Sequence, residues 1–261
     1  MYLLFQYKLN TGDTLISKKH NEIFLFCLIH SIHGFYQFLF VYFIQGIHYK
    51  KTSVKKKGEN LYRACVIVAH PDDETLWAGG TIIMHPECLW EIYTLCRASD
   101  LDRTPKYFKA LSVLNASGEI ADLDDGSAQE PLPEIEVQNQ VLEWVEGHHY
   151  DLLISHGPNG EYTQHRRHEE TSRAVKTLWE NGRIDATELW LFAYGDGGRA
   201  YLPRAEANAP VQFKLPIYVW EKKYYIINEI YGFNQESWEA RTTPKVEAFW
   251  SFNTRNEMSN E

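Results

Sequence analysis

Two short stretches of this sequence carry side chains that could bind a metal ion and activate water. The first, residues 70–74, reads His-Pro-Asp-Asp-Glu. Neutral imidazole and carboxylate are ordinary zinc ligands, so His70 and Asp73 could face one ion if the chain turns sharply between them. Asp72 would then lie beside the ion as a base for a water molecule. The alternative is that Asp72 and Asp73 cap a helix while His70 packs at a strand end.

The second stretch, residues 156–170, reads H-G-P-N-G-E-Y-T-Q-H-R-R-H-E-E. His165 and His168 are three residues apart, so on a helix they would share one face. Two histidines and one carboxylate form a common open zinc shell. Taken alone, a histidine pair at the basic start of a helix also fits a solvated face, so this stretch leaves both interpretations open.

Short apolar runs come directly before both stretches. Residues 64–69 and 150–156 are typical of strands that are buried on both faces in a parallel sheet. The carboxyl ends of parallel strands meet at one edge of the sheet, where ligands bind in open α/β folds. We therefore expect His70 and His165 to converge, although they are 95 positions apart.

The rest of the chain alternates between helix and strand patterns. Strands are also predicted at residues 89–96, 188–193 and 212–219, and helices at 74–83, 103–116, 134–147, 165–181, 224–231 and 235–241. The stripe of Tyr107, Phe108, Leu111 and Leu114 in the second of these helices should face the core. This alternation predicts a layered α/β domain with a mostly parallel sheet.

Charge and composition narrow the class of function. Residues 1–60 hold eight Lys/Arg and three Asp/Glu, a net charge of +5, whereas the remainder holds 18 and 32, a net charge of −14. An acidic main body argues against nucleic-acid binding, which needs a basic face. The sequence has neither a P-loop nor the glycine fingerprint of dinucleotide-binding domains.

Residues 23–47 form an apolar segment without Asp, Glu, Lys or Arg. A bilayer-spanning helix needs roughly 20 such residues. Five lysines follow within residues 50–57, against Lys18 and Lys19 shortly before it, so the positive-inside rule would place the chain after residue 50 in the cytoplasm, anchored to the membrane by this one helix. An interfacial helix, a buried extension of the domain and an artefact of a mis-chosen start codon are the alternatives. We thus expect an N-terminal extension at 1–60, ending in a basic linker, and the main domain at 61–261.

Together the two stretches resemble the PIG-L-like (LmbE-like) zinc-dependent de-N-acetylases. The resemblance rests on A-H-P-D-D-E followed by G-G, and on H-G-P-N-G-E-Y-x-x-H-x-x-H after a strand, and it extends over about residues 63–241. It implies a Rossmann-like three-layer α/β fold and a bound Zn²⁺ or another divalent ion. It also implies removal of acetyl groups from N-acetylglucosamine-type sugar conjugates, as small molecules or lipid-linked.

The resemblance implies roles for individual residues as well. The metal would be held by His70, Asp73 and His168. Asp72 would be the general base that activates water, and His165 would polarise or protonate at the tetrahedral intermediate. Arg97 and Glu161 would contact the substrate, although Glu161, like His156, could also support the metal ligands or the loop.

The second stretch departs from the commonest family pattern at one place. Many members have His-Pro-Asp-His where this chain has His165-Arg166-Arg167-His168. We hypothesise that Arg166 or Arg167 meets a phosphate or carboxylate of the substrate, because guanidinium groups pair well with such anions. Alternatively, both arginines are exposed helix residues that pair with the glutamates at 169 and 170.

Two other functions remain open. One is an amidase of the same fold that cleaves a larger amide, because substrate choice lies in variable loops. The other is a non-catalytic sugar- or nucleotide-binding domain, which would not need a base at Asp72.

Overall fold

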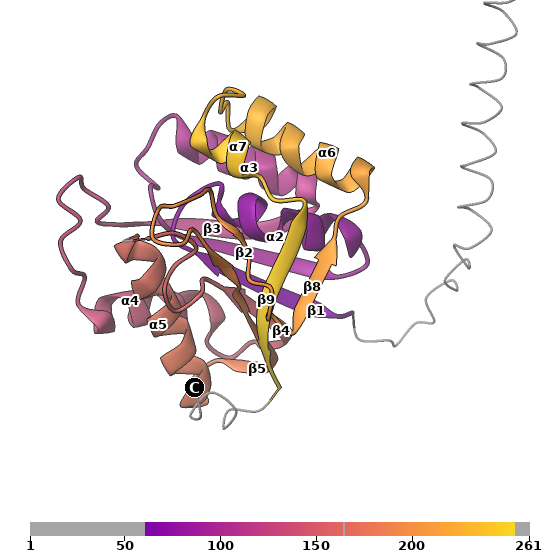
Figure 1. The fold of residues 1–261 in the computed structure, drawn as a ribbon. Coiled ribbons are helices and arrows are strands. Elements are labelled where there is room, and N and C mark those ends of the chain that lie inside the picture. The colour runs from indigo at the N-terminus through magenta and orange to yellow at the C-terminus, as the bar shows by residue number, and fades with distance from the viewer. Residues whose placement is uncertain (1–60, 164, 254–261) are drawn as a thin grey trace, which may run out of the picture. The chain divides into compact units, whose positions relative to one another are not determined.

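A seven-stranded sheet forms the centre of the computed structural model, which describes residues 61–163 and 165–253 (Figure 1). The strand order is β3-β2-β1-β4-β5-β9-β8. The parallel strands are β1 (Arg63–Val68), β2 (Leu89–Cys96), β3 (Ala116–Leu123), β4 (His149–Ser155) and β5 (Asp185–Phe192). At one edge run the antiparallel β9 (Val246–Phe252) and β8 (Val211–Lys214), and a separate small ribbon pairs β6 (Tyr194–Gly195) with β7 (Arg204–Ala205).

Helices cover both faces of the sheet. They are α2 (Asp73–Met84), α3 (Arg103–Leu114), α4 (Glu134–Val145), α5 (Arg166–Glu180), α6 (Ile217–Tyr225), the π-helix η1 (Ile226–Ile230) and α7 (Trp238–Thr242). One apolar core packs α2, α3 and the C-terminal helices on one face, and a second packs α4 and α5 on the other (Figure 1). The predicted three-layer α/β fold with a mostly parallel sheet is therefore confirmed.

The central strand β1 explains why the two motifs meet. Its residues alternate between the two cores, and all positions from Ala64 to Val68 are fully buried. The crossovers through α2 and α3 lie on one face and those through α4 and α5 on the other, so the strand order reverses between β1 and β4. Ligands of open α/β sheets bind in the crevice at this switch point. Both motif stretches begin there.

The structure differs from the predicted elements in the C-terminal third and at one edge. The strands β3 and β9 were not predicted, and the strand predicted at 212–219 ends at Lys214 because Pro216 precedes a helix. Phe108 is 47% exposed, so it lies outside the predicted apolar stripe of α3. Tyr107, by contrast, is fully buried.

A buried polar cluster ties the C-terminal elements to α2. The carboxylate of Glu247 in β9 accepts hydrogen bonds from the amides of Gly80 and Thr81, from the Thr81 hydroxyl and from Lys223 Nζ at 2.6–2.7 Å. Lys223 and Glu247 are both fully buried, so each needs the opposite charge of the other to offset the cost of burying its own charge. A Cβ at Gly80 would lie 2.4 Å from Leu215, which explains a glycine at this close contact.

The predicted apolar helix at 23–47, the basic linker and the domain boundary at residue 60 lie outside the described residues, and they stay predictions. Among the helices that the structure describes, none has the length and apolar character needed to cross a bilayer.

Candidate metal centre

A sharp turn after β1 presents the first motif. The Asp72 backbone has φ 112° and ψ −29°, a sparsely populated conformation that costs about 1–3 kcal/mol and is usually found at functional sites. The Asp72 carbonyl accepts the amides of Thr75 and Leu76 and so starts α2, but the Asp72 side chain makes no capping hydrogen bond. The interpretation of Asp72 as a simple helix cap is therefore not supported.

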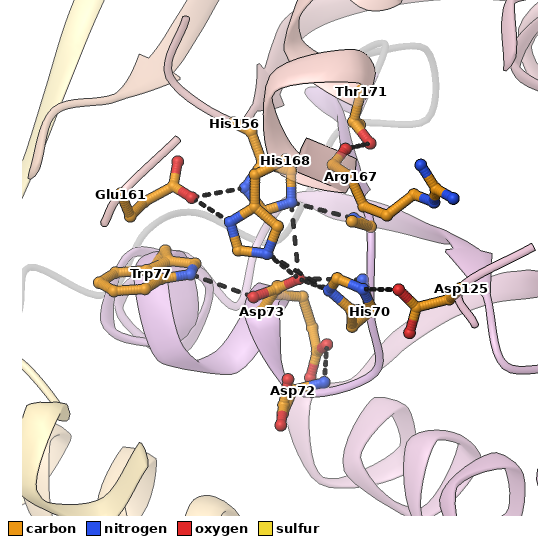
Figure 2. Close-up of polar contacts among 12 residues, drawn as sticks. His70, Asp72, Asp73, Trp77, Asp125, His156, Glu161, Arg167, His168 and Thr171 are labelled. Atoms are coloured by element: carbon orange, nitrogen blue, oxygen red, sulfur yellow. Dashed lines mark hydrogen bonds and ion pairs between the residues drawn. The ribbon is translucent and has the colours of Figure 1, made fainter. Parts of the chain in front are cut away.

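Three atoms with lone pairs converge at this turn (Figure 2). His70 Nδ1 lies 3.1 Å from Asp73 Oδ2 and 3.3 Å from His168 Nε2, and the His168 Nε2–Asp73 Oδ2 distance is 3.2 Å. In a tetrahedral zinc site with bonds of about 2.0–2.1 Å, neighbouring ligand atoms are about 3.3 Å apart. The three residues therefore match the donor set and spacing of a divalent metal site, and the two motifs form one centre.

Carboxylates hold the outer nitrogen of both histidines. Asp125 Oδ1 lies 3.3 Å from His70 Nε2, and Glu161 Oε2 accepts a hydrogen bond from His168 Nδ1 (Figure 2). A carboxylate on the outer nitrogen keeps the proton there and turns the inner lone pair towards the metal position. His70 and His168 are thus oriented as ligands by the protein itself.

The charges around the centre favour a cation. Burial opposes a charge on His168, but Asp73 and Glu161 raise its pKa to about 10. Burial likewise opposes ionisation of Asp73, yet the neighbouring histidines, His168 first, hold its pKa well below the usual range. The two shifts reflect one interaction, an ionised Asp73 beside His168, and a buried carboxylate of this kind is also suited to a divalent ion.

His156, the other buried histidine of the cluster, is placed as a support rather than a ligand. Its Nε2 accepts the amide of Ala69 at 2.9 Å, and its Nδ1 lies 2.8 Å from Glu161 Oε2. Both ring nitrogens are therefore already engaged, although Nε2 lies 3.5 Å from Asp73 Oδ2. The His156 ring stacks on the His168 ring at 3.9 Å and fixes its plane.

Glu161 is fully buried and contacts protein groups on all sides. It bonds to both His156 and His168 and accepts the amide of Gly157 at 2.9 Å. Burial raises its pKa, but His156 and His168 outweigh burial and lower it to about 2, so Glu161 is ionised at neutral pH. The suggested substrate contact does not agree with this placement, whereas a role in orienting the histidines does.

Glu161→Gln should weaken metal binding about 10- to 100-fold, because the neutral amide of glutamine cannot replace the carboxylate as a charged acceptor for both imidazoles. The apparent metal dissociation constant can be measured by competition with a chromogenic chelator. Glu143→Gln on the exposed face of α4 is the matched control and should bind like the parent. Equal affinity in the two variants would contradict the orienting role.

Asp72 lies beside the triangle and is held by an arginine that the sequence did not single out. Arg103 Nη1 donates to Asp72 Oδ2 at 3.0 Å, and the Arg103 guanidinium lies 4.5 Å from the centre of the Phe233 ring. Burial, followed by the charge of Asp73, raises the pKa of Asp72 well above its ordinary value, while Arg103 lowers it. A carboxylate with a raised pKa is suited to accept a proton near neutral pH.

His165 is also close to the centre. Its ring centroid lies 4.8 Å from that of His70 and 3.9 Å from that of His168. Burial, together with His168 and His70, lowers its pKa to about 2, which favours the neutral imidazole. Its Nδ1 is buried without a hydrogen-bond partner in the described part of the chain, and the aspartate that many family members carry at position 167 is here Arg167.

The three arginines suggested as substrate contacts take different places. Arg167 is 2% exposed, and its guanidinium is used by Glu170 and by the carbonyls of residues 124 and 130. Arg166 is exposed and donates to the Gln129 carbonyl. Neither lines the cavity above the triangle, so the structure supports the proposed anion contact for neither arginine. The alternative holds in that Arg167 pairs with Glu170, but Arg167 is buried and not exposed. Arg97 does line the cavity, where its Nε donates to Asp125 Oδ2 at 2.7 Å.

A cavity of about 260 Å³ opens above the triangle. Its wall combines the predicted site residues with side chains from the C-terminal part of the chain, and it is lined by His70, Pro71, Asp72, Asp73, Leu76, Arg97, Arg103, Asp125, Gln129, Tyr162, His165, Trp238 and Glu239. Tyr162 and Trp238 meet edge to face at 4.6 Å and make one aromatic side of it. Sequence reasoning missed Arg103, Asp125 and Trp238.

Comparisons with known proteins agree with this arrangement. Residues 65–179 match the family model of the GlcNAc-PI de-N-acetylases, PIG-L. An uncharacterized protein of Acanthamoeba polyphaga mimivirus is 25% identical over 164 residues, which cover 56% of this chain and 68% of that protein.

Several solved structures share the fold. The N,N'-diacetylchitobiose deacetylase of Pyrococcus horikoshii has a TM-score of 0.56 at 14% identity and covers 78% of this chain and 88% of its own. A deacetylase of teicoplanin biosynthesis also has a TM-score of 0.56, at 12% identity, covering 75% and 100%. The 4-carboxy-2-hydroxymuconate hydratase of Pseudomonas putida has a TM-score of 0.53 at 17% identity, covering 73% and 95%. At these identities the likeness establishes the fold, and the hydratase shows that one fold serves several reactions.

Proposed function

We propose that this protein, whose residues 65–179 match the PIG-L family model, is a metal-dependent N-deacetylase that acts on an N-acetylglucosamine-type sugar conjugate. The observation that carries the proposal is the triangle of His70, Asp73 and His168 beside the base Asp72. His70, Asp72 and Asp73 line an open cavity. The family match supports it, as does the presence of an N,N'-diacetylchitobiose deacetylase and a deacetylase of teicoplanin biosynthesis among proteins of the same fold.

The metal would be held by His70, Asp73 and His168, and Zn²⁺ suits their two nitrogens and one carboxylate oxygen, although other divalent ions share this preference. When bound, such an ion polarises a carbonyl group and lowers the pKa of water towards about 7. Asp125 contacts His70 and Glu161 contacts His168, each on the ring nitrogen that faces away from the triangle, and these carboxylates would fix the imidazole tautomers.

The residues of the chain then divide the proton transfers of amide hydrolysis. Asp72 takes a proton from the attacking water while the oxygen of that water bonds to the acetyl carbon. Asp72 then delivers the proton to the amine nitrogen as the C–N bond breaks. Acetate and the free amino sugar are the products. Arg103 keeps the Asp72 carboxylate directed into the cavity. The neutral His165, on the same cavity, donates a hydrogen bond to the developing oxyanion.

The polar wall of the cavity and its aromatic side suit a sugar. Hydroxyl groups can pair with Arg97, Asp125 or Glu239, and the apolar face of a pyranose ring can pack on Trp238 or Tyr162. If residues 23–47 form the predicted membrane helix, a lipid-linked acetylhexosamine becomes the natural substrate.

The proposal is tested with the full chain, loaded with zinc, on a panel of amides. We expect equimolar acetate and free amine from N-acetylglucosamine conjugates, and no release from N-acyl amino acids or longer acyl amides. Turnover of the longer amides alone would replace the proposal by an amidase of the same fold. Saturable sugar binding without any turnover in the metal-loaded protein would identify a non-catalytic binding domain.

A further inference from the structure

We propose that the C-terminal segment Ile226–Phe233 positions the general base Asp72 from two sides, with Tyr231 and Glu74 as positioning residues. The inference deepens the proposed function and rests on it. The segment lies beyond residues 65–179 that match the PIG-L family, so it adds to the centre from another part of the chain.

One side of this arrangement holds the backbone of Asp72. The Asp72 amide donates to Glu74 Oε2 at 3.0 Å. The other oxygen of Glu74 accepts the Tyr231 hydroxyl at 2.7 Å and the Thr75 hydroxyl at 2.6 Å. Glu74 is fully buried and Tyr231 is 2% exposed, so water does not replace these contacts. Because φ at Asp72 is 112°, the surrounding contacts must hold this conformation, and the Glu74 carboxylate is the group on its amide.

The other side holds the Asp72 side chain. Arg103 donates to Asp72 Oδ2, and the Arg103 guanidinium lies 4.5 Å from the centre of the Phe233 ring. A guanidinium over an aromatic face is attracted to it and loses rotational freedom. Phe233 therefore limits where Arg103, and with it the carboxylate of Asp72, can lie.

The local backbone explains how one short segment reaches both places. The π-helix Ile226–Ile230 ends with the Tyr231 amide on the Ile226 carbonyl at 2.9 Å. Gly232 then adopts φ +81°, and the Phe233 amide bonds to the Ile227 carbonyl at 3.2 Å. This turn separates two neighbouring aromatic residues, one on Glu74 and one under Arg103. Single π-helical turns are frequent at functional sites, in agreement with such a role.

The test compares two buried tyrosines with the same chemistry. Tyr231→Phe removes the hydroxyl that bonds to Glu74, and Tyr150→Phe removes a hydroxyl that bonds to Glu91 at the same distance of 2.7 Å, at the amino end of β4. We expect Tyr231→Phe to lower kcat about 10-fold with KM within about twofold and with unchanged bound zinc, because a displaced base affects the chemical step. Tyr150→Phe should keep the parent kcat.

A second measurement does not depend on turnover. Peptides that contain the Asp72 amide should exchange hydrogen for deuterium faster in Tyr231→Phe than in the parent or in Tyr150→Phe. Equal exchange and equal kcat in the two tyrosine variants would overturn the inference. If the parent shows no turnover, faster exchange in Tyr231→Phe than in that parent would still support the positioning of residue 72 and would overturn only the proposed function.

Glu74 offers a pair of variants in case Tyr231→Phe does not fold. Glu74→Gln keeps an oxygen for the Asp72 amide, whereas Glu74→Ala removes the acceptor. The glutamine variant should retain most of the parent kcat and the slow exchange, and the alanine variant should lose both. The same loss in both variants would mean that Glu74 contributes only through its charge and would overturn the hydrogen-bonded arrangement.

Discussion

His168→Ala is expected to abolish stoichiometric metal binding and to lower kcat/KM at least about 10⁴-fold, since a bound metal ion contributes several kcal/mol to such reactions. Nε2 of His168 is the atom that lies next to both His70 and Asp73. Its removal opens the triangle and takes away the imidazole that contacts the carboxylates of both Asp73 and Glu161. Elemental analysis of the zinc-loaded full chain should give about one zinc per parent molecule and close to none in the variant.

Asp73→Ala should give the same result, which would join the two distant motifs in one centre. The control is His85→Ala, because His85 is a half-exposed histidine that pairs with Glu87 and lies away from the cavity. A full complement of zinc in His168→Ala would exclude the triangle as the binding site. If the parent folds but holds no zinc after incubation with it, the metal centre as a whole would be contradicted.

Asp72→Asn is expected to lower kcat about 10²- to 10⁴-fold while bound zinc stays at the parent level, because general-base catalysis contributes this much and the metal ligands are untouched. The amide has nearly the size of the carboxylate and keeps an oxygen for Arg103. Steady-state kinetics together with elemental analysis separate this loss of chemistry from a loss of metal. Asp102→Asn, an exposed aspartate that pairs with Lys106, is the control.

The pH dependence of the parent provides a second measure of the same group. Burial raises the pKa of Asp72 well above that of an ordinary carboxyl, and the base works only when ionised. Activity should therefore fall with decreasing pH as the Asp72 carboxylate becomes protonated, and Asp72→Asn should lack this limb in its residual activity. A variant with kcat within about threefold of the parent would rule out Asp72 as the base.

The triangle was predictable because its ligands occupy two contiguous stretches, each directly after an apolar run. The run at 64–69 is fully buried in the structure, as a central parallel strand must be. Parallel strands place their carboxyl ends at one edge, so the type of sheet was sufficient to predict that His70 and His168 converge.

Asp125 was not predictable in this way because it follows an unpredicted strand. Residues 116–123 mix small, polar and apolar side chains in a half-buried edge strand, without the continuous apolar run of β1. Gly118 even weakens the strand pattern, yet it is required because a Cβ there would lie 1.7 Å from the Ile92 carbonyl. Arg103 and Trp238 reach the cavity by tertiary packing, which local spacing does not encode.

The placement of Arg167 was a different kind of error. The helix α5 begins at Arg166, with His165 just before it, so Arg167 and His168 are neighbours on the helix and their side chains differ in direction by about 100° around its axis. Arg167 accordingly lies on the side of α5 that meets Glu170 and the loop at 124–130. Arg167 is close to the two histidines in sequence, but this closeness does not place its side chain in the cavity.

The adjacency of β1 and β4 has a consequence for how the chain folds. The contact of Ala69 with His156 joins positions 87 residues apart, and both β2 and β3 lie between them in sequence. During synthesis the ligands of the first motif therefore emerge long before His168, and no complete binding site exists until β4 has docked beside β1. Pairings between such distant positions generally slow folding, because the entropy of loop closure is lost before the contacts form. An ion that binds only the chain with β4 docked beside β1 would stabilise this docked state, by about 2.7 kcal/mol at a hundredfold excess over its dissociation constant.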